Sequence, residues 1–188
     1  MKTITLILIT ILTLTLTLVC TQAVHAQSYI TKNGKISFFS KTDVENIDAV
    51  SNQAISVITP QTGSIAFSVL VNGFLFKKAL MQEHFNENYM ESAKYPKASF
   101  KGTITDVSKV NFTTDGTYNI TVTGDLNIHN VTNKVTVPAV ITVKTGKVSA
   151  NATFKVKLDD YKISVPKIVE GNISKTIEIK VDCNYNPK

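Results

Sequence analysis

The sequence predicts an all-β protein, an antiparallel sheet with one dry face that a single short helix interrupts. Three observations support this prediction. Apolar and polar residues alternate over most of the chain, which is the period of a half-buried strand. Turn-forming residues separate the alternating runs, at Asp115-Gly116, Asn130 to Asn133 and Thr145-Gly146. Only between residues 74 and 102 does the apolar spacing change to three and four residues, which is typical of a helix.

The first element is a secretory leader over residues 1–26. Lys2 supplies its positive end, residues 4–19 form an apolar core diluted by threonine, and Val24-His25-Ala26 fits a small-residue cleavage site. Lipidation of Cys20 is the less favoured alternative, because Val19 stands where a small residue is expected. Residues 27–188 then form a single domain, which is long enough to bury a core.

The strands follow in order, beginning with one that contains Ile36 and Phe38, while residues 44–57 fit either a turn or a strand. The expected inward-facing residues of the later strands are Ile65, Phe67, Val69 and Val71; Ala98, Phe100, Gly102 and Ile104; Tyr118, Ile120, Val122, Leu126 and Ile128; Val135, Val137, Ala139, Ile141 and Val143; Val148, Ala150, Ala152, Phe154, Val156 and Leu158; and Ile173, Ile177, Ile179 and Val181. An antiparallel sheet of this length hides its dry face by closing into a barrel or by folding into a sandwich. The pattern alone does not separate the two.

The helix is expected to run for about four turns and to end at Tyr95-Pro96, because the residue before a proline is pushed out of the helical region. We expect its apolar stripe to cover an edge or a mouth of the sheet. The residues that recur at helical spacing are Leu80, Met81, His84, Phe85 and Tyr89.

Charge and cysteine content exclude some classes of function. The chain has 20 basic residues, all of them lysine, against 14 acidic ones, for a net charge of +6. The lysines are dispersed and no arginine is present, so the sequence does not indicate nucleic-acid binding. A mild attraction to anionic lipid headgroups, and with it transient membrane contact, is the expectation that remains. Cleavage of the leader leaves Cys183 as a lone cysteine, which we interpret as a small buried apolar residue.

The sequence offers little for catalysis, and no enzyme activity, cofactor or metal is predicted. His84 and His129 alone fall short of a zinc site unless carboxylates complete the set. The chain has no nucleophile elbow and no glycine-rich phosphate loop. A hydrolase that uses His129 is the weakest of the hypotheses.

Three stretches of the sequence resemble the YceI-like family of periplasmic polyisoprenoid-binding proteins. They are LMQEHFNENYMES with the following KYPKASFKG, GDLNIHNVTNKV (Gly124 to Val135) and DDYKISVP (Asp159 to Pro166). The resemblance implies an extended antiparallel lipocalin-like β-barrel of about eight strands, with an apolar cavity for a long isoprenoid chain. One departure concerns residues 36–40, which read ISFFS where many members carry a histidine and arginines. Because the chain has no arginine, a lipid with a quinone or another neutral headgroup is expected to bind more readily than one with a pyrophosphate headgroup.

The inward-facing set contains many small residues, which fit either a hollow barrel or a filled core in which large and small side chains interlock. With the resemblance, we predict a secreted, periplasmic, non-enzymatic carrier or store for an isoprenoid-type lipid, either polyprenyl or quinone-like. The alternative is a structural or interaction module with a filled barrel and no ligand. The candidate ligand-binding residues, in the cavity and in the helix that covers it, are Phe38, Phe67, Val69, Leu80, Met81, Phe85, Phe100, Ile120, Val122, Leu126, Val137, Ala139, Ile141, Ala150 and Phe154.

Overall fold

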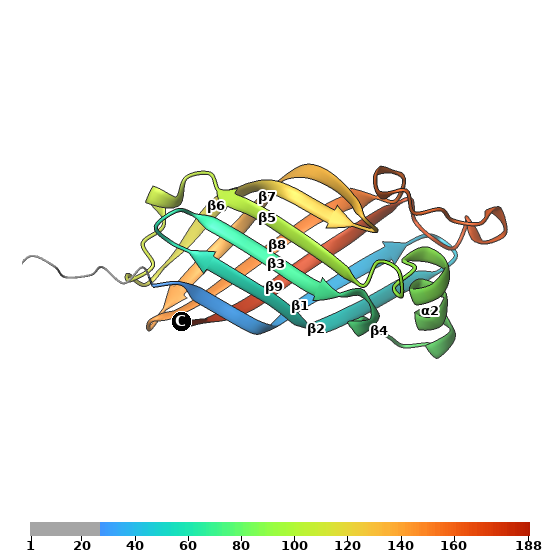
Figure 1. Ribbon diagram of the computed structural model, residues 1–188, viewed down its shortest axis with the longest axis horizontal. Coiled ribbons are helices and arrows are strands. Elements are labelled where there is room, and N and C mark those ends of the chain that lie inside the picture. The colour runs from blue at the N-terminus through green and yellow to red at the C-terminus, as the bar shows by residue number, and fades with distance from the viewer. Residues whose placement is uncertain (1–26) are drawn as a thin grey trace, which may run out of the picture.

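The computed structural model describes residues 27–188, which form a closed antiparallel β-barrel (Figure 1). Its strands are β1 (Tyr29–Lys41), β2 (Asn46–Thr59), β3 (Ser64–Leu70), β4 (Leu75–Phe76), β5 (Lys97–Ile104), β6 (Gly116–Ile128), β7 (Val131–Lys144), β8 (Lys147–Lys157) and β9 (Thr176–Pro187). Hydrogen bonding runs in the order β1-β9-β8-β7-β6-β5-β3-β2, and β2 pairs back with β1 to close the ring. The short β4 pairs with the first half of β2. The prediction of an eight-stranded antiparallel barrel with one helix is therefore confirmed, and the alternative arrangement of the sheet as a sandwich is wrong. The predicted leader, residues 1–26, lies outside the described residues.

Two hairpins show how local sequence sets the register of the barrel. Thr145 and Gly146 join β7 to β8 with φ of 50° and 73°, the conformation of a tight two-residue turn. His129 and Asn130 join β6 to β7 in the same way, with φ of 51° and 60°. The predicted turn at Asn130 to Asn133 was too late, because Val131 already pairs with Ile128 across the hairpin.

The strands at the two ends of the chain differ in part from the prediction. Residues 46–59 form β2, which settles the ambiguous stretch as a strand. Strand β9 starts at Thr176 and leaves Ile173 in the preceding loop, but it continues to Pro187 because it pairs with both β8 and β1. In β1 the register shifts on either side of Gly34, where a Cβ atom would come within 2.7 Å of the Cys183 Sγ.

The helical segment is shorter than four turns. Helix α2 (Ala79–His84) continues into the π-helical turn η2 (Phe85–Tyr89), and the Met90 amide donates to the Phe85 carbonyl at 2.9 Å. The segment ends well before Pro96, so the proline is not what stops it. The inclusion of Leu80 in the covering stripe was wrong, because its side chain is 60 % exposed. Residues 80 and 81 point about 100° apart on a helix, and it is the Met81 side that faces the barrel.

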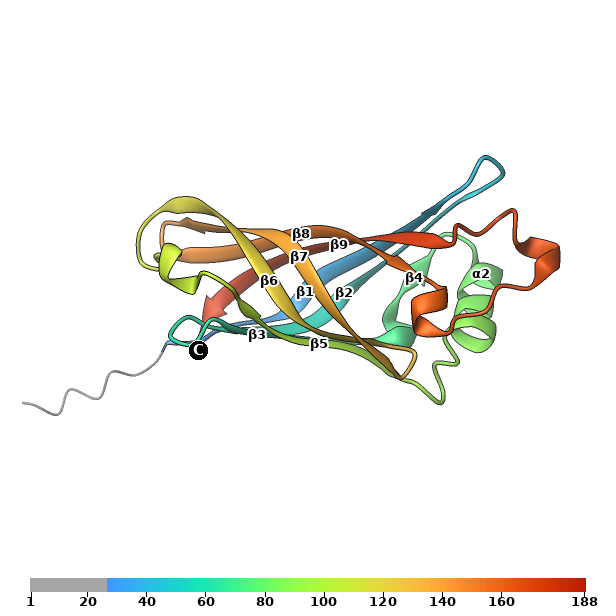
Figure 2. The same ribbon diagram turned by 90° about the horizontal axis from the view of Figure 1, so that it is seen from above.

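The barrel is filled at one end and hollow at the other. At the end that holds Ser28 and the C-terminus, the Lys188 amide donates to the Ser28 carbonyl at 2.8 Å, and Tyr29, Ile58 and Tyr185 are buried in one continuous cluster. Helix α2 and the loop between β8 and β9 lie at the opposite end (Figure 2). Within residues 27–188, no helix is both long enough and apolar enough to cross a membrane.

Candidate functional site

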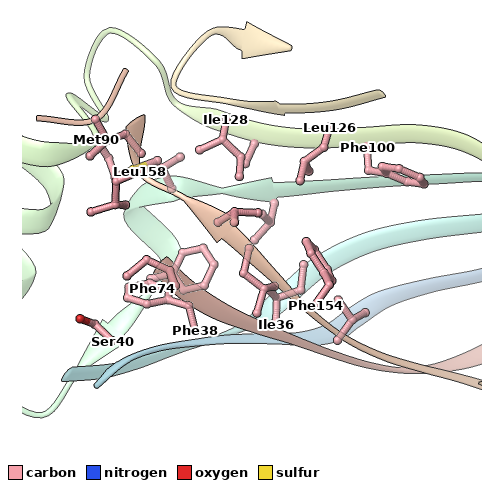
Figure 3. A pocket seen from close by; sticks show the side chains of 18 of the residues that line it. Ile36, Phe38, Ser40, Phe74, Met90, Phe100, Leu126, Ile128, Phe154 and Leu158 are labelled. Carbon is pink, nitrogen blue, oxygen red and sulfur yellow. The ribbon is translucent and has the colours of Figure 1, made fainter. Parts of the chain in front are cut away.

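The hollow half of the barrel is an apolar cavity of about 360 Å³ whose lining reaches Met81 and Phe85 at the α2 end. We infer that it opens there, because a buried cluster fills the other end of the barrel. Its wall consists of inward-facing side chains from opposite sides of the barrel, with Phe100, Leu126 and Ile128 facing Ile36 and Phe38 in Figure 3. Inward-facing residues such as Phe154 are only partly buried, although they point away from bulk solvent. A filled barrel would bury them fully, so this half of the interior is hollow.

Every predicted ligand-binding residue except Leu80 lies on the wall of this cavity. Whether these residues bind a ligand stays a prediction. Sequence reasoning missed the residues that shape the opening. Most of them lie in short or irregular segments without a strand period, while Ser40 and Ile47 lie at the ends of β1 and β2. These include Ser40, Glu45, Ile47, Phe74, Phe76, Met90, Ile163, Val165, Val169 and Asn172. The alternation of Phe74 and Phe76 directly before the helix was the signal available for two of them.

Four phenylalanine rings hold α2 against the opening. Phe38 of β1 contacts Phe74, Phe76 and Phe85, with ring centroids 5.4, 5.7 and 5.3 Å apart. Phe85 also contacts Phe74 at 5.9 Å and Phe76 at 5.0 Å. Such aromatic pairs each contribute about 0.5–1.5 kcal/mol beyond the burial of their area. The helix is therefore fixed by the same rings that line the cavity.

A pair of glycines determines where the Phe100 ring lies. Gly102 and Gly124 face each other across β5 and β6, and a Cβ atom on either would come within 2.5 and 2.8 Å, respectively, of the Phe100 Cζ. The ring can therefore lie close against the wall, where side chains on these glycines would displace it. Below it, Ile141 and Ala150 form the floor of the cavity and also belong to the buried cluster of the closed end. The cavity is thus closed at this end.

Polar residues gather at the rim of the opening. The Glu45 carboxylate accepts a hydrogen bond from the Lys78 ammonium at 3.0 Å and one from the Asn172 side-chain amide at 3.3 Å. The Lys78 hydrogen bond, followed by that of Asn172, holds the pKa of Glu45 below its ordinary value. The Ser40 hydroxyl accepts a hydrogen bond from the Ser174 amide at 2.8 Å. These bonds connect the β1–β2 turn with α2 and with the loop between β8 and β9.

The two histidines have different surroundings. His84 lies on the cavity wall at the rim. His129 lies in the turn between β6 and β7, where its Nε2 lies 2.9 Å from the Glu91 carboxylate and its Nδ1 lies 3.3 Å from the Tyr161 carbonyl. The Tyr95 ring packs edge-on against it at 4.8 Å. Both hydrogen-bond partners are acceptors, so both bonds form together only when each ring nitrogen carries a hydrogen. The residue connects three segments beside the cavity.

Nothing in the described part of the chain forms a group of three or more metal-ligating side chains. The buried thiol of Cys183 faces the closed end, and burial raises its pKa to about 11. Its neighbour Tyr185 shares a hydrogen bond of 2.8 Å with Ser56, and burial raises the pKa of this tyrosine as well. These groups are neutral at ordinary pH and complete the polar contacts beneath the cavity.

The fold and the cavity can be compared with known proteins. The model of the YceI-like domain family matches residues 21–185. A polyisoprenoid-binding domain from Saccharophagus degradans, implicated in plant cell wall breakdown, is similar in structure with a TM-score of 0.75 and 13 % identity, over 87 % of this chain and 99 % of that one. BcnA of Burkholderia cenocepacia has a TM-score of 0.66 and 17 % identity, over 81 % and 96 % of the two chains. The YceI protein of Campylobacter jejuni has a TM-score of 0.53 and 16 % identity, over 72 % and 80 %. No curated protein sequence matches the chain.

Proposed function

The chain belongs to the YceI-like family, and from this membership and the cavity we propose that it binds a long-chain isoprenoid-type lipid inside the barrel. The observation that carries the proposal is the blind apolar cavity of about 360 Å³. Its volume lies within the range of roughly 300–1,000 Å³ that is usual for pockets of small ligands.

Burial of the lipid tail supplies enough free energy for binding without a polar motif. Each methylene removed from water contributes about 0.8 kcal/mol, so twenty of them give roughly 16 kcal/mol before costs. Loss of motion on association removes roughly 4–15 kcal/mol. A tail that fills the cavity and continues along the opening therefore binds usefully by itself.

The shape of the cavity orients the ligand. Because the floor at Ile141 and Ala150 is closed and the polar residues stand at the rim, the tail enters first and the head stays near Glu45, His84 and Asn172. This rim offers a carboxylate, an amide and an imidazole, and the chain contains no arginine. It suits a neutral head such as a quinone better than a pyrophosphate.

The role that fits this geometry is a carrier or store, with no chemistry performed on the lipid. The same proposal places the protein outside the cytoplasm, in the periplasm, because residues 1–26 have the composition of a secretory leader. An apolar lipid crosses an aqueous compartment only when its tail is shielded from water.

The test is organic extraction of the protein purified from its native source, followed by mass spectrometry. We expect an isoprenoid-type lipid in the extract, at a molar ratio to protein far above that of bulk membrane lipids. A protein from the same source with a filled interior, purified in the same way, is the control. An extract without lipid, together with no uptake of an added polyprenol or quinone, would leave the structural module as the better hypothesis.

A further inference from the structure

We propose that the open end of the barrel is a membrane-docking surface, in which Val44, Leu80 and Ile168 insert among the headgroups of an electrically neutral bilayer. These three side chains, here called the docking tips, are 70 %, 60 % and 92 % exposed. They belong to three separate segments: the β1–β2 turn, helix α2 and the 3₁₀ turn η5 (Lys167–Val169). Figures 1 and 2 both show these segments at the end of the barrel opposite the C-terminus.

The exposed apolar residues are unevenly distributed over the described part of the chain. Besides the docking tips, the large exposed apolar residues are Ile55, Leu70 and Leu75. Leu75 lies in β4, which contacts α2, so four of the six surround the opening. The docking tips belong to none of the buried clusters, so core packing does not account for them.

Each docking tip continues directly into the cavity wall. The residue that follows each tip in the sequence, Glu45, Met81 or Val169, lines the cavity. In two of the three cases, Met81 after Leu80 and Val169 after Ile168, this wall residue is itself apolar. The docking tips therefore stand directly beside the rim of the cavity.

The hydrogen bonds of Glu45 also hold the three segments together. This residue adjoins Val44, and it bonds Lys78 near Leu80 and Asn172 near Ile168. The tips are thereby positioned before they meet a membrane, which reduces the conformational entropy lost on docking. Three projecting points at loop ends suit a deformable bilayer, whereas a protein partner of standard affinity needs a continuous face of about 800 Å².

The charge of the open end indicates which bilayer it fits. Residues 41–48, 77–97 and 157–175 contain nine lysines and nine carboxylates, so this end is neutral in total. Within residues 27–188, the excess positive charge lies on the rest of the barrel. Insertion therefore depends on apolar contact and does not require anionic lipid.

The experiment is flotation of the purified protein with phosphatidylcholine vesicles. We compare the parent with the variant Val44→Ser/Leu80→Ser/Ile168→Ser, and we use Ile55→Ser, on the outer face of β2, as the matched control. The triple variant should partition at least roughly tenfold more weakly, because three apolar side chains no longer enter the bilayer. The control should stay within about twofold of the parent, since isolated surface substitutions have small effects. Circular dichroism should show the same fold for all three proteins.

Two further measurements separate this inference from its alternatives. Addition of phosphatidylglycerol, or of salt to ~0.5 M, should change partition of the parent by less than about threefold, because screening acts on charge. The docking proposal is overturned if the parent does not float with phosphatidylcholine vesicles, or if the triple variant floats as well as the parent. It is also overturned if flotation requires anionic lipid and is abolished by salt. The docking assay uses no cavity ligand, so it is independent of the proposed function. If the protein yields lipid on extraction but does not float with vesicles, only the docking proposal is contradicted. If it floats with vesicles but never carries lipid, only the proposed function is contradicted.

Discussion

Substitution of Ala139 by phenylalanine tests whether the hollow half of the barrel is the space that a lipid occupies. Ala139 faces the cavity from β7, opposite Ala152 of β8, and it is only partly buried. The new ring enters the cavity and displaces a ligand segment of about six carbons, which at ~0.8 kcal/mol per methylene removes up to about 5 kcal/mol of binding free energy. Even a quarter of this loss weakens binding by about tenfold.

The effect of Ala139→Phe on the free energy of unfolding should differ between a hollow and a filled barrel. Overpacking a filled core costs about 1–3 kcal/mol, because side chains are forced off their rotamers. In a hollow barrel the ring gains about 1.5–3 kcal/mol from burial, which offsets local strain. We therefore expect an unchanged or slightly higher melting temperature together with the loss of bound lipid.

The assay measures both quantities on one preparation, by thermal unfolding and by the lipid extracted per mole of protein. Val140→Phe is the matched control, because Val140 is the adjacent residue, does not line the cavity and pairs with Asn119 and Asn151. This control should keep its lipid. The reasoning is refuted if Ala139→Phe retains lipid at the parental level, or if it is destabilised by several kcal/mol while the parent also carries no lipid.

Three further predictions concern the cover, the histidine beside the cavity and the buried thiol. In the absence of membranes, Met81→Ser/Phe85→Ser should release lipid several-fold faster with the β signal in circular dichroism retained, whereas Leu80→Ser, which is not on the cavity wall, should not change this rate. A double variant that unfolds outright would show that the helix belongs to the core. His129→Ala should lower the free energy of unfolding by about 1 kcal/mol, because its hydrogen bonds are lost, yet keep lipid affinity within a few-fold; a tenfold loss of affinity would assign this histidine a role in binding. Burial raises the pKa of the Cys183 thiol from 9.0 to about 11, so the folded protein holds this proton more tightly than the unfolded chain does. Its contribution to stability should be complete below pH 9 and decline as the pH rises to about 11, and in pH-dependent denaturation Cys183→Ala should show a smaller decline than the parent.

The alternation of the strands could be interpreted from the sequence alone. A strand directs successive side chains to opposite faces whatever its partner is, so Ile120 and Val122 were predicted to face inward before any pairing was known. The hairpin at Thr145-Gly146 was predictable for the same reason, because a glycine in a two-residue turn is a local signal. The candidate wall residues on the strands depended only on this local periodicity.

The opening of the cavity depended on contacts between segments that are distant in sequence. Phe38 and Phe85 meet because closure of the barrel brings β1 to α2, and the same closure brings Glu45 to Asn172. The exposure of Leu80 follows from the rotation of a short helix about its axis, which packing against the barrel determines and helical spacing does not. Whether the barrel is hollow also depends on the total volume of the side chains that all the strands direct inward. Periodicity states which way a side chain points, whereas only the closed barrel determines how much space remains between the side chains that point inward.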